Sequence, residues 1–134
     1  VCAVRSAMEE GILPGGGLAL YDQAKKCETN VNNVKITKSR AIAFAILARA
    51  LTAPLVQIMS NAGYEKKFIE QYTSMEKPTG VGINVKTKEK GNLIEMGVID
   101  PMKVTKEALQ NAVSVAVTIL STNAIVTIAR SYEK

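Results

Sequence analysis

Apolar residues recur every three or four positions along much of this chain, which is the spacing of one face of an α-helix. The longest such stretch is SRAIAFAILARALTAPLVQIMSNAG, which predicts a helix from about 39 to 62. Its main apolar stripe is made of Leu47, Leu51, Leu55 and Ile58 or Met59. The stretch is apolar on nearly all sides, so we expect it to lie inside a larger body, with a kink at Pro54.

Shorter stretches predict further helices over 1–10, from 18 to about 26, and over 65–72. Gly11 is suited to end the first of them, because glycine readily adopts the left-handed conformation that closes a helix. The segment CETNVNN, which follows the second, is polar and is interpreted as a loop.

A last long helix is predicted to run to about Ser121, with Asp100 as its cap and Pro101 in its first turn. The inner face expected for it consists of Val104, Ala108, Ala112, Val115 and Ile119. Three short segments, GINV, GVID and AIVTI, are better suited to extended structure. The chain is therefore predicted to be mainly α, with short extended segments and a C-terminal strand.

Composition limits the possible classes of protein. The chain has 134 residues, 47% of them hydrophobic, which suits one domain with a core. Its net charge is +5, but the lysines are scattered, which favours a solvated surface over a nucleic-acid site. Two cysteines make no disulfide framework and indicate a reducing compartment. The sequence shows no apolar run that we expect to span a bilayer, so neither nucleic acid nor membrane is predicted as a partner.

Candidate chemistry is limited because the chain has no histidine. This excludes Ser-His and Cys-His nucleophile pairs and histidine metal sites within the chain, and two cysteines alone cannot hold a structural zinc. No catalytic and no metal-binding residue is predicted.

The glycines Gly15, Gly16 and Gly17, which directly precede a predicted helix, are the best lead. Backbone N–H groups at a helix start attract anions, and glycine lets a ligand approach closely. A hinge or a tight helix contact explains the three glycines equally well.

Asn84 and Asp100 are the second lead, because each lies in a predicted extended piece. An Asp can bind a ribose hydroxyl pair, and an Asn amide can bind a base edge. The alternative is that Asp100 only caps the helix that follows it.

Three segments together resemble the group I chaperonins, the bacterial and organellar 60-kDa heat-shock proteins. They are AMEEGILPGGGLAL, ALTAPLVQIMSNAG and GINV…GNLIEMGVIDPMKVTKEALQNAVSVA. The similarity runs in order across nearly the whole chain, which looks like the C-terminal quarter of such a protein. It implies that 1–10 is the last helix of the intermediate domain and that 11–134 is the C-terminal half of the helical equatorial domain, including a small β-hairpin.

The resemblance also implies a nucleotide site for ATP or ADP with Mg. In the family the residue matched by Gly16 contacts the nucleotide through its backbone, that matched by Asn84 approaches the adenine, and that matched by Asp100 binds the ribose. Val98 matches an apolar residue against the base. This chain has Val85 and Lys86 where the family often has two alanines, so the adenine pocket is expected to be bulkier.

Family members form rings of seven subunits that act with a co-chaperonin on unfolded client proteins, in the bacterial cytoplasm or in the mitochondrial or plastid matrix. The family usually has a basic residue where this chain has Val56, at a helix end that lies, like Glu65, near the ring–ring contact, so a single ring or a double ring stays open. The phosphate loop, metal-binding Asp and catalytic Asp of the family have no counterpart in this chain, so we expect no ATP hydrolysis by the chain alone. The alternatives are a stand-alone helical interaction module without nucleotide binding and a basic nucleic-acid binder with a steep salt dependence.

Overall fold

A computed structural model describes residues 2–33, 36–124 and 126 of the chain. These residues are mostly helical, with two small two-stranded sheets. The elements in order are α1 (Cys2–Glu10), β1 (Ile12–Pro14), α2 (Leu18–Asn33), α3 (Lys38–Asn61), α4 (Lys66–Ser74), β2 (Val81–Ile83), β3 (Lys90–Asn92), β4 (Ile99–Pro101) and α5 (Met102–Leu120). The predicted mainly α fold is confirmed, whereas the predicted strand AIVTI lies mostly outside the described residues.

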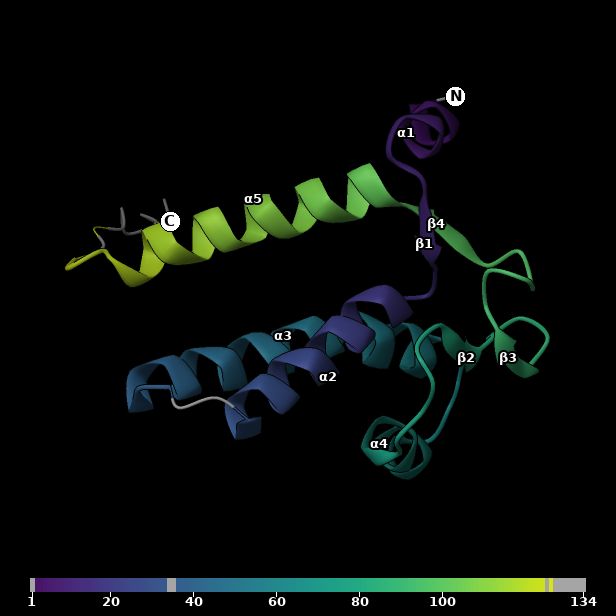
Figure 1. Ribbon diagram of the computed structural model, residues 1–134, viewed down its shortest axis with the longest axis horizontal. Coiled ribbons are helices and arrows are strands. Elements are labelled where there is room, and N and C mark those ends of the chain that lie inside the picture. Colours follow the sequence, from purple (N-terminus) through teal and green to yellow (C-terminus); the bar gives the residue numbers. More distant parts are fainter. Residues whose placement is uncertain (1, 34–35, 125, 127–134) are drawn as a thin grey trace, which may run out of the picture.

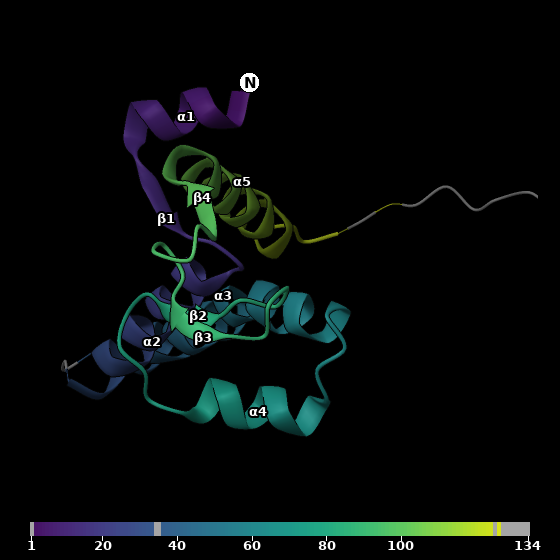
Figure 2. The same cartoon turned by 90° about the vertical axis from the view of Figure 1, so that its right-hand side faces the viewer.

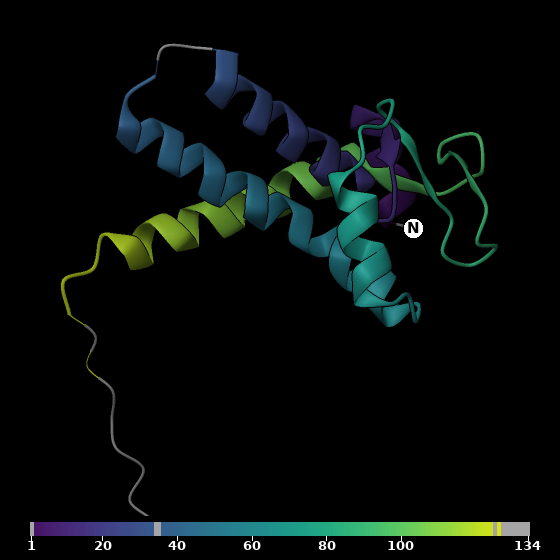
Figure 3. The same ribbon diagram turned by 90° about the horizontal axis from the view of Figure 1, so that it is seen from below.

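Helices α2 and α3 form the central layer, where they lie side by side over most of their length (Figure 3). Helix α5 lies on one side of this layer and α4 on the other (Figure 1). Figure 2 shows that α1 crosses near the start of α5 and that β1 runs from there down to the central layer, beside β4.

The core has two parts, and α3 contributes to both. The larger cluster consists of Leu18, Tyr21, Leu55, Met59, Ile69, Tyr72 and Leu93. The smaller cluster consists of Ala24, Ala48 and Leu51. The predicted stripe on α3 is therefore confirmed at Leu51, Leu55 and Met59, and Leu47 is half-buried beside it.

Helix α3 is also long and apolar enough, by length and composition alone, to cross a membrane. The expectation that the chain has no such run was therefore wrong. In the described residues only 22% of its apolar window is buried, at the face that packs against α2 and α4, so the expectation that α3 lies inside the body holds for that face alone.

The segment CETNVNN is helical, and its interpretation as a loop was wrong. Helix α2 continues to Asn33 because it packs along α3, with Cys27 against the smaller core cluster. The Lys25–Glu28 ion pair, at 2.9 Å, and a hydrogen bond from Thr29 Oγ1 to the Lys25 carbonyl add local support. Tertiary packing thus overrides the weak helix propensity of Asn and Thr.

The short strands form two antiparallel pairs. Strand β2, which lies within GINV, pairs with β3 in a hairpin, with Gly82 opposite Gly91. Strand β4 pairs with β1, a strand that was not predicted, with Leu13 opposite Asp100. Asp100 is consequently a strand residue, and the N-cap of α5 is Pro101, with no side-chain cap. The expectation that Asp100 caps this helix was wrong.

The face of α5 that was expected to point inward is exposed. Val104, Val115 and Ile119 are 48%, 60% and 59% exposed, and no residue within Met102–Leu120 is buried. Leu109 packs against the smaller core cluster. The helix otherwise stands apart from α2 and α3 (Figure 1), so its apolar residues have no neighbours to bury them in the described part of the chain.

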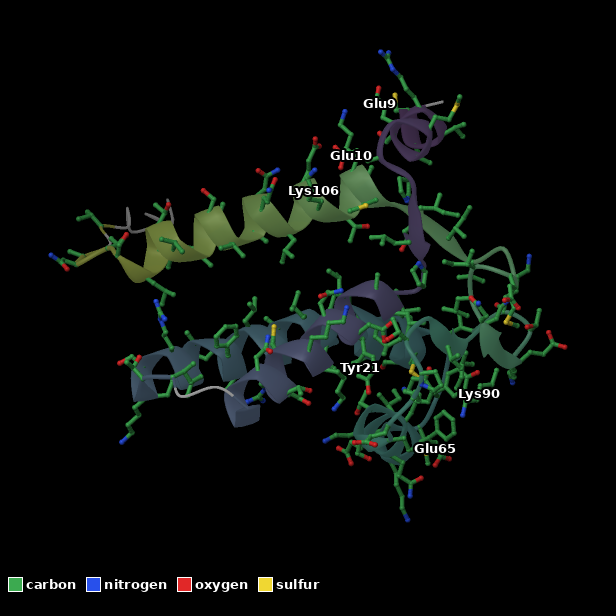
Figure 4. The ribbon with its side chains drawn as sticks, in the orientation of Figure 1. Glu9, Glu10, Tyr21, Glu65, Lys90 and Lys106 are labelled. Atoms are coloured by element: carbon green, nitrogen blue, oxygen red, sulfur yellow. The ribbon has the colours of Figure 1, made fainter. Side chains whose placement is uncertain are left out.

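Ion pairs join α1 to α5. Lys103 lies 2.6 Å from Glu9, and Lys106 lies 2.7 Å from Glu10. Figure 4 shows Glu9, Glu10 and Lys106 together where the two helices meet. Helix α1 has no buried residue of its own among Cys2–Glu10, so these pairs and the β1–β4 ladder hold its position.

We expect the Glu9 carboxyl to titrate below its usual pKa of 4.5, because Lys103 donates a hydrogen bond to it and attracts its charge. Its contribution to stability is present above pH 4.5 and is lost as the pH falls through the lowered pKa. Carboxyl ¹³C NMR should show the Glu9 midpoint return toward 4.5 in Lys103→Met. Lys106→Met, which removes the partner of Glu10, is the control; if it shifts Glu9 equally, the pairing is not the cause.

Candidate functional site

The three glycines connect β1 to α2, and each has a different environment. Gly15 is buried, and its N–H donates to the carbonyl of Val98 at 2.9 Å. A Cβ at Gly15 would lie 3.2 Å from backbone atoms of Val98 and Ile99. Gly15 therefore fastens the glycine turn to the segment that leads into β4.

Gly17 is the point of closest approach between the turn and α3. Its φ is +76°, and a Cβ there would lie 2.7 Å from the backbone nitrogen of Leu55. Such a distance leaves no room for any side chain. Of the explanations left open for the glycines, a tight helix contact therefore holds for Gly17.

Gly16 differs from both neighbours because the space beside it is nearly open. Its φ is +65°, and among the described residues the only atom that a Cβ at this position would approach is Leu93 Cδ1, at 4.0 Å. A ligand could therefore approach its backbone, so the anion-facing explanation suits Gly16 alone.

Val98 and Asp100 lie next to this turn. The Val98 carbonyl accepts from Gly15, its N–H donates to the Leu93 carbonyl at 2.8 Å, and its side chain packs against the larger core cluster. Asp100 is two residues further along the chain, within β4, where it lies opposite Leu13. Asp100 is exposed. The structure thus places Val98 beside the glycine turn, whereas Asp100 pairs with Leu13, two residues before Gly15.

Asn84 lies in the turn between β2 and β3, where its amide oxygen accepts from the backbone N–H of Lys86 at 3.0 Å. The carbonyl of Asn84 accepts from Lys88 at 2.7 Å, which closes the turn. Val85 packs against the larger core cluster and Lys86 is exposed. Among the described residues no hydrogen bond joins this turn to Asp100, although Val85 and Val98 both pack against the larger core cluster.

Leu93 is a supporting residue that the sequence did not indicate. It is 2% exposed, and a Cβ at Gly82 would lie 2.9 Å from its Cδ1. Leu93 therefore packs between the hairpin and Gly16. The available signal was that Leu93 and Ile94 are the first apolar residues after the polar run KEKGN.

The arrangement can contact a small polar ligand but has no catalytic group of its own. An open glycine backbone, an apolar side chain and an exposed carboxylate can contact a phosphate, a base and a sugar respectively. Within the described residues, no three Cys, Asp or Glu side chains gather closely enough to hold a metal ion.

Comparison with solved structures defines the class of protein. The described fold is similar to the crystal structure of a group III chaperonin in the open state, with a TM-score of 0.74 and 26% sequence identity over 90% of this chain and 25% of that chain. The mainly α chaperonin fold expected from the sequence is therefore confirmed.

Sequence comparison gives the family. The TCP-1/cpn60 chaperonin family matches residues 1–130. Chaperonin GroEL 1 of Mycobacterium tuberculosis (strain ATCC 25618 / H37Rv) and that of Mycobacterium bovis (strain BCG / Pasteur 1173P2) are each 42% identical over 126 residues. The match covers 94% of this chain and 23% of each relative. The chain belongs to the TCP-1/cpn60 chaperonin family, and it spans about a quarter of the length of these relatives.

Proposed function

We propose that this chain is the C-terminal portion of a group I chaperonin, an ATP-driven protein-folding machine. Residues 1–10 would be the last helix of the intermediate domain, and 11–134 the C-terminal half of the equatorial domain. The higher identity to proteins named GroEL 1, at 42%, than to the group III structure, at 26%, supports group I. The junction at Gly11, where α1 ends with a φ of +91°, supports the domain boundary.

The proposed role of the chain is to supply the adenosine side of the ATP pocket. The observation that carries this proposal is the joining of the glycine turn to the β4 segment by the Gly15–Val98 hydrogen bond. It supports a position of the open Gly16 backbone near Val98 and near the β4 segment that carries Asp100. Gly16 would face the nucleotide, Val98 the base and Asp100 the ribose hydroxyls.

Asn84, Val85 and Lys86 would complete the adenine side. The Asn84 amide oxygen is engaged within its own turn, so its NH₂ group is the part left to face a base. The Mg ion and the groups that act on the phosphates would come from residues outside this chain, and we propose no hydrolysis by the chain alone.

The exposed apolar face of α5 supports the proposal of a longer parent protein. Valines and isoleucines that are about half exposed in the described residues would be covered by other parts of the equatorial domain. The parent would form heptameric rings, act with a co-chaperonin on unfolded clients, and reside in a bacterial cytoplasm or an organellar matrix.

The test is ADP binding by the full-length protein, measured by isothermal titration calorimetry for wild type and Asp100→Ala. Losing the ribose contact should weaken binding by about 1–3 kcal/mol, because the hydroxyls lose a charged acceptor. Asp100 caps no helix, so the variant should keep its thermal stability.

Glu107→Ala is the matched control, since Glu107 is an exposed carboxylate on α5 and should leave ADP binding unchanged. If Asp100→Ala binds ADP as well as wild type does, the pocket assignment fails although the family assignment stands. If the wild type also binds no nucleotide, the stand-alone interaction module is the better description.

A further inference from the structure

Asp22 is a half-buried carboxylate on α2 to which the proposed nucleotide site gives no role. Its Oδ2 accepts a hydrogen bond of 2.9 Å from the backbone N–H of Gly80, a residue 58 positions further along the chain. Gly80 is buried and directly precedes β2. A carboxylate that accepts from a backbone N–H makes one of the stronger kinds of hydrogen bond. Asp22 therefore fastens the start of the β2–β3 hairpin to α2.

Three further hydrogen bonds lead from Gly80 to the glycine turn. The carbonyl of Gly80 accepts from the Leu93 N–H at 3.1 Å. The carbonyl of Leu93 accepts from Val98 at 2.8 Å, and that of Val98 accepts from Gly15 at 2.9 Å. Gly80, Leu93 and Val98 each donate with their N–H and accept with their carbonyl. The four bonds therefore form one continuous hydrogen-bond series from Asp22 to Gly15.

The far end of this series returns to the same helix. The carbonyl of Gly15 accepts from the Leu18 N–H at 3.2 Å, which joins the glycine turn to the start of α2. Asp22 lies four residues after Leu18 and therefore on the same face of the helix. Figure 1 shows the β2–β3 hairpin beside the end of α2 into which β1 leads. Gly16, between Gly15 and Leu18, thus belongs to a closed ring of chain and hydrogen bonds, and the Asp22 side chain closes that ring.

Packing follows the same route as these bonds. A Cβ at Gly80 would lie 3.9 Å from Cγ of Pro14, the residue that directly precedes the glycine turn. A Cβ at Gly82 would lie 2.9 Å from Leu93 Cδ1 and 3.0 Å from Leu18 Cδ2. The hairpin therefore fits closely against β1 and α2. Because closely packed groups transmit strain, a shift at Gly80 would reach the glycine turn.

We propose that Asp22 is a positioning residue for the backbone of Gly16, acting through the hydrogen-bond series that begins at Gly80 and ends at Gly15. The effect on nucleotide binding rests on the proposed function, whereas the anchoring rests on the hydrogen bonds alone. Without the carboxylate the Gly80 N–H loses its acceptor, and the backbone of the turn gains freedom. A ligand that binds there must then order this backbone, which lowers its affinity.

The charge of Asp22 provides a competing explanation. Burial raises the pKa of Asp22, and the Gly80 hydrogen bond and the nearby charges of Lys77 and Lys26 oppose that rise. An effect that depends on attraction to these two lysines would be lost in Asp22→Asn. An effect that depends on the hydrogen bond would largely be kept, because the amide oxygen of Asn also accepts. The Asn variant therefore separates the two explanations.

The first measurement is hydrogen exchange of the full-length protein, followed at single residues by mass spectrometry. Asp22→Ala should speed exchange roughly ten-fold at the N–H groups of Leu93 and Val98, because a hydrogen bond to a charged group is lost at the start of the series. Ala48 and Leu51, in the smaller core cluster, should keep their rates. Asp22→Asn should exchange more slowly than Asp22→Ala and close to wild type.

The second measurement is ADP binding by the same full-length variants. Asp22→Ala should weaken binding several-fold, and Asp22→Asn should restore most of the affinity, since it keeps an acceptor for Gly80. Glu28→Ala is the matched control. Glu28 is an exposed carboxylate on the same helix and pairs with Lys25 at 2.9 Å, so its removal should change neither the exchange nor the affinity.

Unchanged exchange along the series in Asp22→Ala would overturn the proposal. A rise that extends equally to the smaller core cluster would also overturn it, because the substitution would then destabilise the whole domain. An Asn variant that behaves like the Ala variant would assign the effect to charge instead. Faster exchange with unchanged ADP affinity would overturn the positioning of Gly16. If the wild type binds no ADP, the proposed function fails, and the exchange pattern alone decides whether Asp22 anchors the turn.

Discussion

Gly17→Ala is expected to lower the free energy of unfolding by about 3 kcal/mol, from a steric clash and from backbone strain. The added Cβ would lie 2.7 Å from Leu55 N and 3.0 Å from Leu55 Cα. Both are backbone atoms of α3, which cannot rotate away as a side chain could. The turn and α3 must therefore separate, at the point where the larger core cluster meets the candidate site. Urea unfolding followed by circular dichroism measures the loss.

Gly63→Ala is the matched control for this substitution. Gly63 has a φ of +83°, close to that of Gly17, but no atom lies within 4 Å of a Cβ built there. It should lose only the strain of a left-handed alanine, about 1 kcal/mol. The difference between the two variants isolates the close approach. If both variants lose the same free energy of unfolding, α3 does not constrain the turn. The assignment of separate roles to the three glycines would then be wrong.

The spacing of apolar residues predicted the helices well, because helical periodicity is a relation between residues that are close in sequence. The stripe of Leu51, Leu55 and Met59 follows directly from spacing, and α3 begins and ends within a residue of the expected bounds. The second half of α2 was missed because Asn and Thr favour loops locally. What decides that segment is the contact of Cys27 with the smaller core cluster, in which Ala48 and Leu51 come from α3.

The strands could not be predicted in the same way. Strand β1 has three residues, one of them proline, and its partner β4 begins 85 residues after β1 ends. Strand β3 has the sequence KGN, which has no apolar alternation. Such strands form because segments that are distant in sequence pair with each other. A short window of sequence contains no information about that pairing.

The candidate site was predicted as a set of residues but not as a geometry. The resemblance indicated Gly16, Val98 and Asp100; the Gly15–Val98 hydrogen bond joins the glycine turn to the segment that leads into β4, and nucleotide binding by the three residues stays a prediction. It gave no indication that Asn84 is engaged in its own turn. Composition could not distinguish the roles of three consecutive glycines, because the distinction depends on Val98, Leu93 and Leu55, which are distant in sequence.

Leu93→Ala is expected to lower the free energy of unfolding by about 3 kcal/mol, since it removes a fully buried side chain and leaves a cavity. Leu93 is 2% exposed and lies in one core cluster with Leu18, and its Cδ1 would lie 2.9 Å from a Cβ at Gly82 and 4.0 Å from one at Gly16. The hairpin and the glycine turn would both lose their common support. Urea unfolding should show a lower midpoint with an unchanged slope, because the same surface is still exposed on unfolding.

Ile94→Ala is the control, because this neighbouring residue is 41% exposed and should cost about 1 kcal/mol or less. If Leu93→Ala loses three times as much free energy of unfolding as Ile94→Ala does, the cavity is the cause, and the change in backbone propensity is not. The same two variants separate stability from binding when ADP affinity is measured in the full-length protein. If Leu93→Ala weakens ADP binding and Ile94→Ala does not, the core beneath Gly16 holds the nucleotide-facing backbone in position. An affinity unchanged in both variants would mean that Gly16 is held by the Gly15–Val98 hydrogen bond and by Gly17 alone.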